Sequence, residues 1–288
     1  MKVSPLRQRM LDVLQLNGFS PRTVGSYIHA VEYLTRYYRR SPDSITPDEV
    51  QHWLLWLLKE RGVSASTCRL YFNGVRFLYV QVLADKAFSE YRFTLPKLQQ
   101  RQPDLLTRAE VDALIHQPAY PVHRLMLQSC YACGLRVSEL VSIRVKDIDG
   151  ERRLLHVVQG KGHKDRYVPI PASLLTDWRV YWQRYRPIDW LFPGLHNRRL
   201  SVTQPQRVYV TSKRALGIRK HGGIHSLRHA FATHSLQAGM PVHQLQRILG
   251  HANLGTTSCY VHWLEDSRPD GDNIDLLAGL GGDSPCSG

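Results

Sequence analysis

The sequence predicts a mainly α-helical protein with a small β-sheet, organised as two domains. The chain has 288 residues, which favours two domains over one. Helix signals recur along most of the chain, whereas strand-like runs are confined to residues 154–158 and 167–170. The expected boundaries are residues 1–92 for the first domain, 93–103 for a proline-containing linker, 104–266 for the second domain and 267–288 for an acidic tail.

Four helices are expected in the first domain. Three of them begin with the same pair, a hydroxyl residue followed by proline, at positions 4–5, 20–21 and 46–47. The hydroxyl can cap the helix, and proline is tolerated at the first helical position because no N–H is needed there. The fourth helix is expected over residues 64–83, with Leu70 on its hydrophobic stripe together with Leu78 and Val82.

The second domain is expected to open with a capping box formed by Thr107 and Glu110. An apolar helix over residues 122–133 leads to Gly134 and to Arg136 and Glu139, which are three positions apart. The two strand candidates flank a glycine-punctuated turn and form a hairpin-like segment. Further helices are expected over residues 174–185, 204–216, 226–237 and 242–249.

Residues 225–260 carry polar side chains at spacings that suggest one site. His225 and Arg228 are three apart, so they share one face of a helix. His251 follows the next apolar segment, and Tyr260 comes nine residues later. Arginine offers phosphate a planar, bidentate fork, histidine can move a proton near neutral pH, and tyrosine can attack phosphorus. The pattern therefore predicts a phosphate-binding site that contains a nucleophile.

This stretch closely resembles the carboxy-terminal signature of the tyrosine recombinases, the phage integrase family. Each motif is short, but the ordered set is specific. The matching segments are Gly134-Leu135-Arg136-Val137-Ser138-Glu139-Leu140, Gly160-Lys161-Gly162, His225-Ser226-Leu227-Arg228-His229, Ala232-Thr233-His234, Leu249-Gly250-His251 and Thr256-Thr257-Ser258-Cys259-Tyr260.

The resemblance implies a set of catalytic roles. Arg136 and Arg228 would clamp the two nonbridging oxygens of a DNA phosphodiester. Tyr260 would attack phosphorus, giving a 3′-phosphotyrosyl intermediate and a free 5′-hydroxyl. The phenol has an ordinary pKa of about 10, so it needs a proton acceptor, for which His225 is the better candidate. Lys161 would protonate the leaving oxygen.

Other polar residues of these motifs are expected to assist. His251 would donate a hydrogen bond to a phosphate oxygen, and Glu139 would orient Arg136 or a neighbouring base. His229 and His234 are interpreted as structural.

No cofactor or metal is expected. Cys130 and Cys133 form a CxxC pair, but no second pair completes a zinc site, so we interpret both as core residues. The scheme stores bond energy covalently and needs no ATP, and the glycines around Lys161 are too few for a nucleotide-binding loop.

The charge distribution predicts double-stranded DNA as the partner. The chain has a net charge of +14 and a pI near 9.8. Residues 93–264 carry 24 basic and 10 acidic groups, residues 1–92 carry 13 and 8, and residues 265–288 carry 1 and 6. The positive excess therefore lies where the motifs lie, as a polyanion partner requires, although a generally basic, soluble surface is the alternative.

The first domain resembles the SAM-like core-binding domain that precedes the catalytic domain in this family, through its helix count, its position and the segment Phe19-Ser20-Pro21-Arg22-Thr23. The resemblance implies a homo-tetramer working on two duplexes, with the linker helping two domains close around DNA. The candidate phosphate contacts are Arg22, Arg36, Arg39, Arg40, Arg69 and Arg76.

Several alternatives remain open. A type IB topoisomerase shares this chemistry, and a DNA-binding protein could keep the fold without catalysis. Phage, transposon and Xer-type roles are not separated by the sequence. The acidic tail is either a solubilising end or a docking segment for a neighbouring protomer, through Ile274, Leu277 and Leu280. The N-terminal residues lack a signal-peptide core, so a cytoplasmic location is expected.

Overall fold

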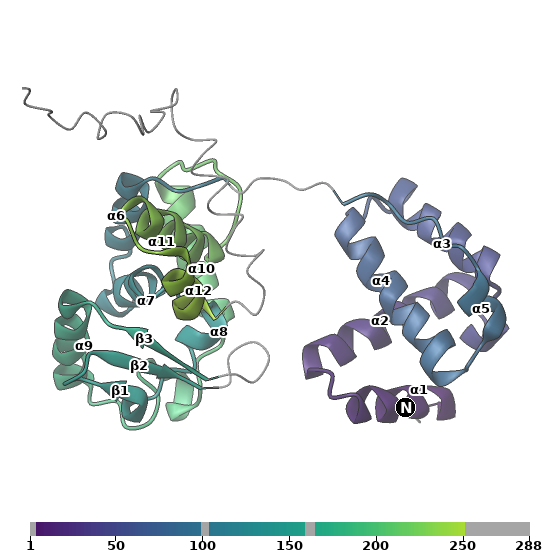
Figure 1. The fold of residues 1–288 in the computed structure, drawn as a ribbon, viewed down its shortest axis with the longest axis horizontal. Coiled ribbons are helices and arrows are strands. Elements are labelled where there is room, and N and C mark those ends of the chain that lie inside the picture. The colour runs from purple at the N-terminus through teal and green to yellow at the C-terminus, as the bar shows by residue number, and fades with distance from the viewer. Residues whose placement is uncertain (1–3, 99–103, 159–164, 251–288) are drawn as a thin grey trace, which may run out of the picture. The chain divides into compact units, whose positions relative to one another are not determined.

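The computed structural model describes residues 4–98, 104–158 and 165–250 (Figure 1). The chain divides into two compact units, Met1–Arg101 and Gln102–Gly288. The first is helical, and the second combines helices with one three-stranded antiparallel sheet. The predicted fold class, mainly α with a small sheet and two domains, is confirmed. Within the described residues, no helix is long and apolar enough to cross a membrane.

The helices of the first unit begin where their capping residues lie. The hydroxyls of Ser4, Ser20, Thr46 and Ser64 each accept a hydrogen bond from a backbone N–H in the first turn. The elements are α1 (Pro5–Leu16), α2 (Pro21–Tyr38), η1 (Pro42–Ser44), α3 (Pro47–Lys59), α4 (Ala65–Phe77), η2 (Leu78–Val82) and α5 (Lys86–Glu90).

The fourth helix differs from the prediction in two ways. The α-helix ends at Phe77, and the chain continues as one π-helical turn, η2. Leu70 is 40% exposed, so its place on the buried stripe was wrong, whereas Leu78 and Val82 are buried. The short helix α5 was not predicted, because five residues are too few for a periodic pattern.

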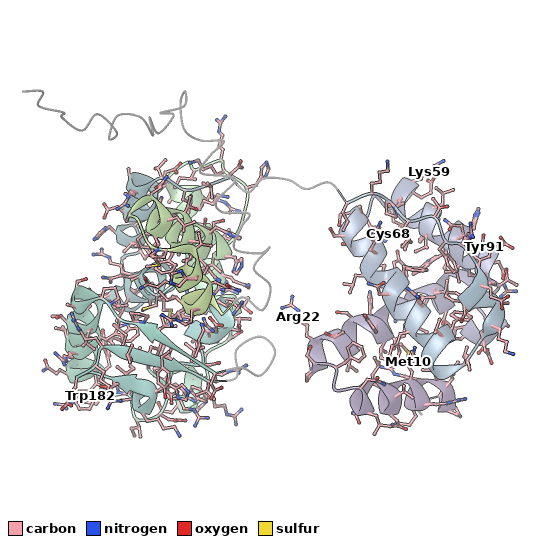
Figure 2. The ribbon with its side chains drawn as sticks, in the orientation of Figure 1. Met10, Arg22, Lys59, Cys68, Tyr91 and Trp182 are labelled. Carbon is pink, nitrogen blue, oxygen red and sulfur yellow. The ribbon has the colours of Figure 1, made fainter. Side chains whose placement is uncertain are left out.

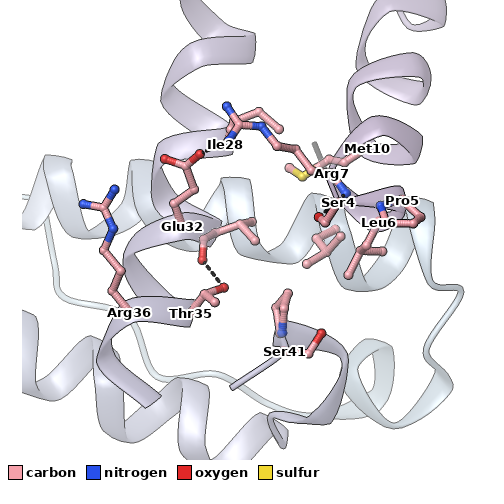
Figure 3. Close-up of a pocket in the computed structure, with 13 residues that line it drawn as sticks. Ser4, Pro5, Leu6, Arg7, Met10, Ile28, Glu32, Thr35, Arg36 and Ser41 are labelled. Carbon is pink, nitrogen blue, oxygen red and sulfur yellow. Dashed lines mark hydrogen bonds and ion pairs between the residues drawn. The ribbon is translucent and has the colours of Figure 1, made fainter. Parts of the chain in front are cut away.

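A cavity of about 610 Å³ lies in the first unit and is bordered by α1, α2, η1 and the start of η2 (Figure 3). Most of its wall is apolar, with Met10, Ile28 and Leu78 among the lining residues. The Thr35 hydroxyl at its edge is satisfied by the carbonyl oxygen of Val31, at 2.9 Å. The cavity contains none of the predicted catalytic residues.

In the second unit, the two predicted strands pair as expected, with Leu155 opposite Val168. A third strand was missed because it has only two residues. The elements are α6 (Arg108–His116), α7 (Pro121–Ala132), α8 (Val137–Leu140), η3 (Val145–Asp147), β1 (Ile148–Asp149), β2 (Leu154–Val157), β3 (Arg166–Pro169), α9 (Ala172–Tyr185), η4 (Leu195–Asn197), α10 (Thr203–Ala215), α11 (His225–Gln237) and α12 (Val242–Leu249).

Helix α7 is the centre of the second unit, in contact with α6, α8, α9, α10 and α11. Cys130 and Cys133 are buried in this core, which confirms their interpretation as core residues. Burial raises the pKa of the Cys133 thiol to about 12, so the thiol stays protonated at neutral pH. Helix α12 packs against both β3 and α11. These contacts bring the loop after α7, the start of β3 and the end of α12 together.

Candidate active site

The carboxylate of Glu139 is the centre of the candidate site. Glu139 belongs to α8, a four-residue helix that begins directly after Arg136. The Arg136 backbone N–H donates to Oε2 at 2.8 Å, and its side-chain Nη1 donates to Oε1 at 2.7 Å. The predicted contact between Glu139 and Arg136 is therefore present. Only 6% of the Glu139 side chain and 18% of the Arg136 side chain are exposed.

Arg228 approaches the same carboxylate from α11. Its Nη1 lies 3.7 Å from Glu139 Oε2, which is an ion pair without a hydrogen bond. Nη1 donates to the carbonyl oxygen of Gly134 at 2.7 Å, and Nη2 donates to that of Leu249 at 2.6 Å. The side chain is 1% exposed. Arg228 thus joins the loop after α7 to the end of α12.

Arg166, at the start of β3, was missed by the sequence analysis. Its Nη1 and Nη2 donate to the two oxygens of Glu139, each at 2.8 Å. Its Nε donates to the carbonyl oxygen of Ile248 at 2.7 Å. A usable signal was present: Arg166 shares a strand face with buried Val168, and an inward arginine requires a partner.

The pKa of Glu139 reflects this crowding of cations. Burial is the largest single influence on this pKa and raises it, whereas the hydrogen bonds and the charge of Arg166 lower it. The backbone N–H of Arg136 and the charge of Arg228 lower it further, to about 2. Glu139 is therefore ionised at every pH at which the protein would work. Three arginines surround one carboxylate, so the site keeps a net positive charge suited to a phosphate.

His225 is the first residue of α11, one turn before Arg228. The residue is exposed, yet surrounding atoms partly desolvate its ring, and this desolvation lowers its pKa. The positive charges of Arg228 and Arg136 lower it further, and Glu139 opposes them weakly. The imidazole is therefore neutral near pH 7 and able to accept a proton.

The other two histidines of α11 have contacts that fit structural roles. The ring of His229 packs edge-on against His225, with centroids 4.8 Å apart. Burial, reinforced by His225 and Arg228, lowers the pKa of His229 to about 4. His234 is buried, with its Nδ1 2.9 Å from the Tyr131 hydroxyl and its Nε2 3.1 Å from the Leu106 carbonyl oxygen.

The structure brings together Arg136, His225 and Arg228 around Glu139. Lys161, His251 and Tyr260 lie outside the described residues. His251 directly follows Gly250, the residue that ends α12 beside Arg166. Within residues 4–98, 104–158 and 165–250, no group of three or more His, Cys, Asp or Glu residues could hold a metal ion.

The arginines proposed for DNA contact in the first unit differ in their surroundings. Arg40 pairs with Glu49, and the Nε of Arg69 donates to the carbonyl oxygen of Pro96 at 2.9 Å. Figure 2 shows Arg22 projecting outward from the start of α2, whereas Met10 points into the interior. The exposed members of the set are Arg22, Arg36, Arg39, Arg40 and Arg76.

Comparison with known proteins defines the class. Residues 104–266 match the phage integrase family, and residues 6–87 match the N-terminal SAM-like domain of phage integrases. The tyrosine recombinase XerA of Thermococcus onnurineus is 33% identical over 274 residues, covering 93% of this chain and 94% of that protein. The chain therefore belongs to the phage integrase family of tyrosine recombinases.

Solved structures share the fold. A lambda integrase dimer bound to a COC′ core site superposes with a TM-score of 0.72 at 18% identity, covering 89% of this chain and 97% of that one. The Tn1549 transposon integrase in complex with circular intermediate DNA gives a TM-score of 0.70 at 19% identity, covering 91% and 99%. The function that this membership supports is site-specific DNA recombination or integration, by an enzyme that transfers DNA strands.

Proposed function

We propose that Arg136, Lys161, His225, Arg228, His251 and Tyr260 form the active site of this recombinase. The observation that supports the proposal best is the shared contact of Arg136 and Arg228 with Glu139, which holds two guanidinium groups on one carboxylate. Two arginines fixed side by side offer several N–H donors to the nonbridging oxygens of one phosphate. They would stabilise the charge that gathers on phosphorus in the transition state.

The proposed cleavage step exchanges one phosphodiester for another. The Tyr260 phenolic oxygen bonds to phosphorus as the bond to the 5′-oxygen breaks, which leaves a 3′-phosphotyrosyl bond and a 5′-hydroxyl. His225 accepts the phenol proton, and Lys161 gives a proton to the leaving oxygen. His251 donates to a phosphate oxygen. Attack by a 5′-hydroxyl from a second strand reverses every step and releases Tyr260.

The state of His225 supports its place in this scheme. Because desolvation and the neighbouring arginines lower its pKa below the ordinary value of about 6.5, the ring is neutral at pH 7. Cleavage is expected to lose rate as the pH falls through this lowered pKa, since a protonated imidazole cannot accept the phenol proton.

The same scheme uses neither a metal ion nor ATP, since the phosphotyrosyl bond conserves the energy of the phosphodiester. Covalent complex formation should therefore proceed at an unchanged rate in excess chelator without nucleotide. A loss of activity that added Mg²⁺ restores would contradict this part of the proposal.

Covalent capture tests the nucleophile. Protein incubated with sheared genomic DNA from its source cell is recovered under denaturing conditions, and the attached ends are sequenced. The wild type should attach at a defined site, whereas Tyr260→Phe should not attach. The matched control is Tyr185→Phe, a half-exposed tyrosine of α9, which should attach normally. Covalent attachment by Tyr260→Phe would overturn the assignment.

The same preparations separate the two alternative functions. A type IB topoisomerase would relax supercoiled plasmids that lack the captured site, whereas a recombinase requires that site. A DNA-binding protein without catalysis would bind the site and form no covalent complex in any variant.

We also propose that a homo-tetramer acts on two duplexes, within the cytoplasm, and that the acidic tail couples neighbouring protomers. Truncation after Asp266 removes Ile274, Leu277 and Leu280, which recur at three-residue spacing. Gel-shift affinity for a single site should then be unchanged, while pairing of two sites and strand exchange weaken. Normal strand exchange by the truncated protein would leave only a solubilising role for the tail.

A further inference from the structure

Glu139 receives four hydrogen bonds, and two of them come from a residue with no role in the proposed chemistry. Arg136 supplies its backbone N–H and Nη1, and Arg166 supplies Nη1 and Nη2, one to each carboxylate oxygen. An ionised carboxylate has about four lone-pair positions. The acceptor capacity of Glu139 is therefore filled, half of it by Arg166.

The hydrogen bonds from Arg166 to Glu139 affect Arg136 and Arg228, the two arginines proposed to clamp the phosphate. Arg228 Nη1 lies 3.7 Å from Glu139 Oε2, just beyond hydrogen-bond range. Without Arg166, two lone pairs of a carboxylate that is only 6% exposed would lose their donors. An unsatisfied buried charge is costly, so Arg228, together with the N–H groups of Arg136 that Glu139 does not already accept, would turn onto it. The N–H groups that point at Glu139 can then no longer donate to the phosphate.

Arg166 also fixes the end of α12. Its Nε donates to the Ile248 carbonyl oxygen, and Arg228 holds the next carbonyl, that of Leu249. Gly250 closes the helix with φ +63°, and a Cβ there would lie 2.9 Å from Arg166 Cδ. The arginine is therefore packed against the backbone from which His251 continues.

We infer that Arg166 is a positioning residue for strand transfer: by saturating Glu139, it keeps Arg136 and Arg228 directed at the scissile phosphate. The inference rests on the proposed function, because it concerns the same two arginines. Arg166 itself is buried, with 8% of its side chain exposed, and its three donor groups are all engaged by protein acceptors.

A double-variant experiment separates this role from simple anchoring of α12. Arg166→Met keeps an unbranched side chain but removes every donor. It should slow covalent complex formation on the captured site about 10- to 100-fold, with DNA affinity changed less than about threefold. Adding Glu139→Gln removes the negative charge that would attract the clamp. The double variant should recover about tenfold of the lost rate, because the two residues act through one contact.

The controls make each outcome decisive. Arg179→Met removes an exposed arginine of the same unit, which donates to the Gly150 carbonyl oxygen, and should retain the wild-type rate. Arg166→Lys keeps the charge but lacks the two parallel donors of the guanidinium group, and it takes the place of Arg166→Met if that variant fails to fold. The rate that Arg166→Lys loses should likewise be partly restored by Glu139→Gln. A double variant no faster than the single variant would overturn the inference, as would a wild-type rate for Arg166→Met. Failure of the wild type to form a covalent complex would instead overturn the proposed function.

Discussion

Arg228 of α11 donates to the carbonyl oxygen of Gly134 at 2.7 Å, across 94 positions of sequence. Gly134 has φ +58°, a left-handed conformation that glycine adopts without strain. A Cβ there would lie 2.5 Å from Cδ1 of Phe231 and 3.0 Å from Cδ2 of Leu249. The turn that carries Arg136 is therefore pressed against both α11 and α12, with no room for a side chain.

Gly134→Ala is the first test of this packing. The new methyl group must displace Phe231, which shifts the carbonyl that holds Arg228. We expect a loss of stability about 1–3 kcal/mol beyond that of Gly217→Ala, together with slower cleavage. Gly217 is a matched control because its φ is +65° and its Cβ would meet nothing within 4 Å. If urea unfolding shows the same loss of stability in both variants, the left-handed backbone conformation, and not the contact with Phe231, accounts for that loss.

Replacing Arg136 by lysine tests the clamp itself. Lysine keeps the charge but cannot donate to Glu139 and to a phosphate with one rigid fork. We expect cleavage of a nicked duplex carrying the captured site to slow about 100-fold or more, by comparison with the removal of one oxyanion donor. Binding measured by gel shift should change little. A cleavage rate within a few-fold of the wild type would contradict a role in the transition state.

The role of Lys161 can be separated from that of the arginines by changing the leaving group. A bridging 5′-phosphorothiolate leaves without needing a proton. This substrate should therefore restore the cleavage rate of Lys161→Ala much more than that of Arg136→Ala. The measurement compares the cleavage rates of both variants on matched oxygen and sulfur substrates. Equal restoration of both variants would move the general acid to His225 or His251.

The half-buried His229 predicts a pH-dependent stability. Its folded pKa of about 4 lies below its ordinary value near 6.5, so the unfolded chain binds the proton first as the pH falls. Stability is complete above pH 6.5 and declines between pH 6.5 and 4, by about 1.4 kcal/mol per pH unit for one such group. The pKa values of His225 and His234 are also lowered in the folded protein, so both residues add to the loss of stability at low pH.

His229→Gln should reduce the stability lost between pH 7.5 and 5.0 by about 1–2 kcal/mol. Urea-dependent hydrogen exchange in peptides of α7 and α11 measures this for the second unit alone. His221→Gln, at an exposed position of the same unit, is the control and should follow the wild type. An unchanged pH dependence in His229→Gln would assign the proton uptake to other histidines.

The sequence by itself determined most of the helix starts and the inventory of chemical groups. Caps act within one turn, so Ser4, Ser20 and Thr46 identify helix starts without any tertiary information. The three-residue spacing of Arg136 and Glu139 likewise predicts their contact, because Arg136 is the residue that caps the short helix on which Glu139 lies. The ordered motifs were enough to indicate the family that the comparisons then established.

Only the tertiary structure decided which groups share the carboxylate. Arg166 is 27 positions from Glu139, and Arg228 meets Gly134 across 94. Such contacts depend on how β3, α11 and the end of α12 pack around α7, and no local pattern encodes that packing. Leu70 illustrates the same limit, since its helical spacing suited burial while the packed helix leaves it 40% exposed. Local rules determine the elements, but long-range packing sets the distances and burial that tune a site.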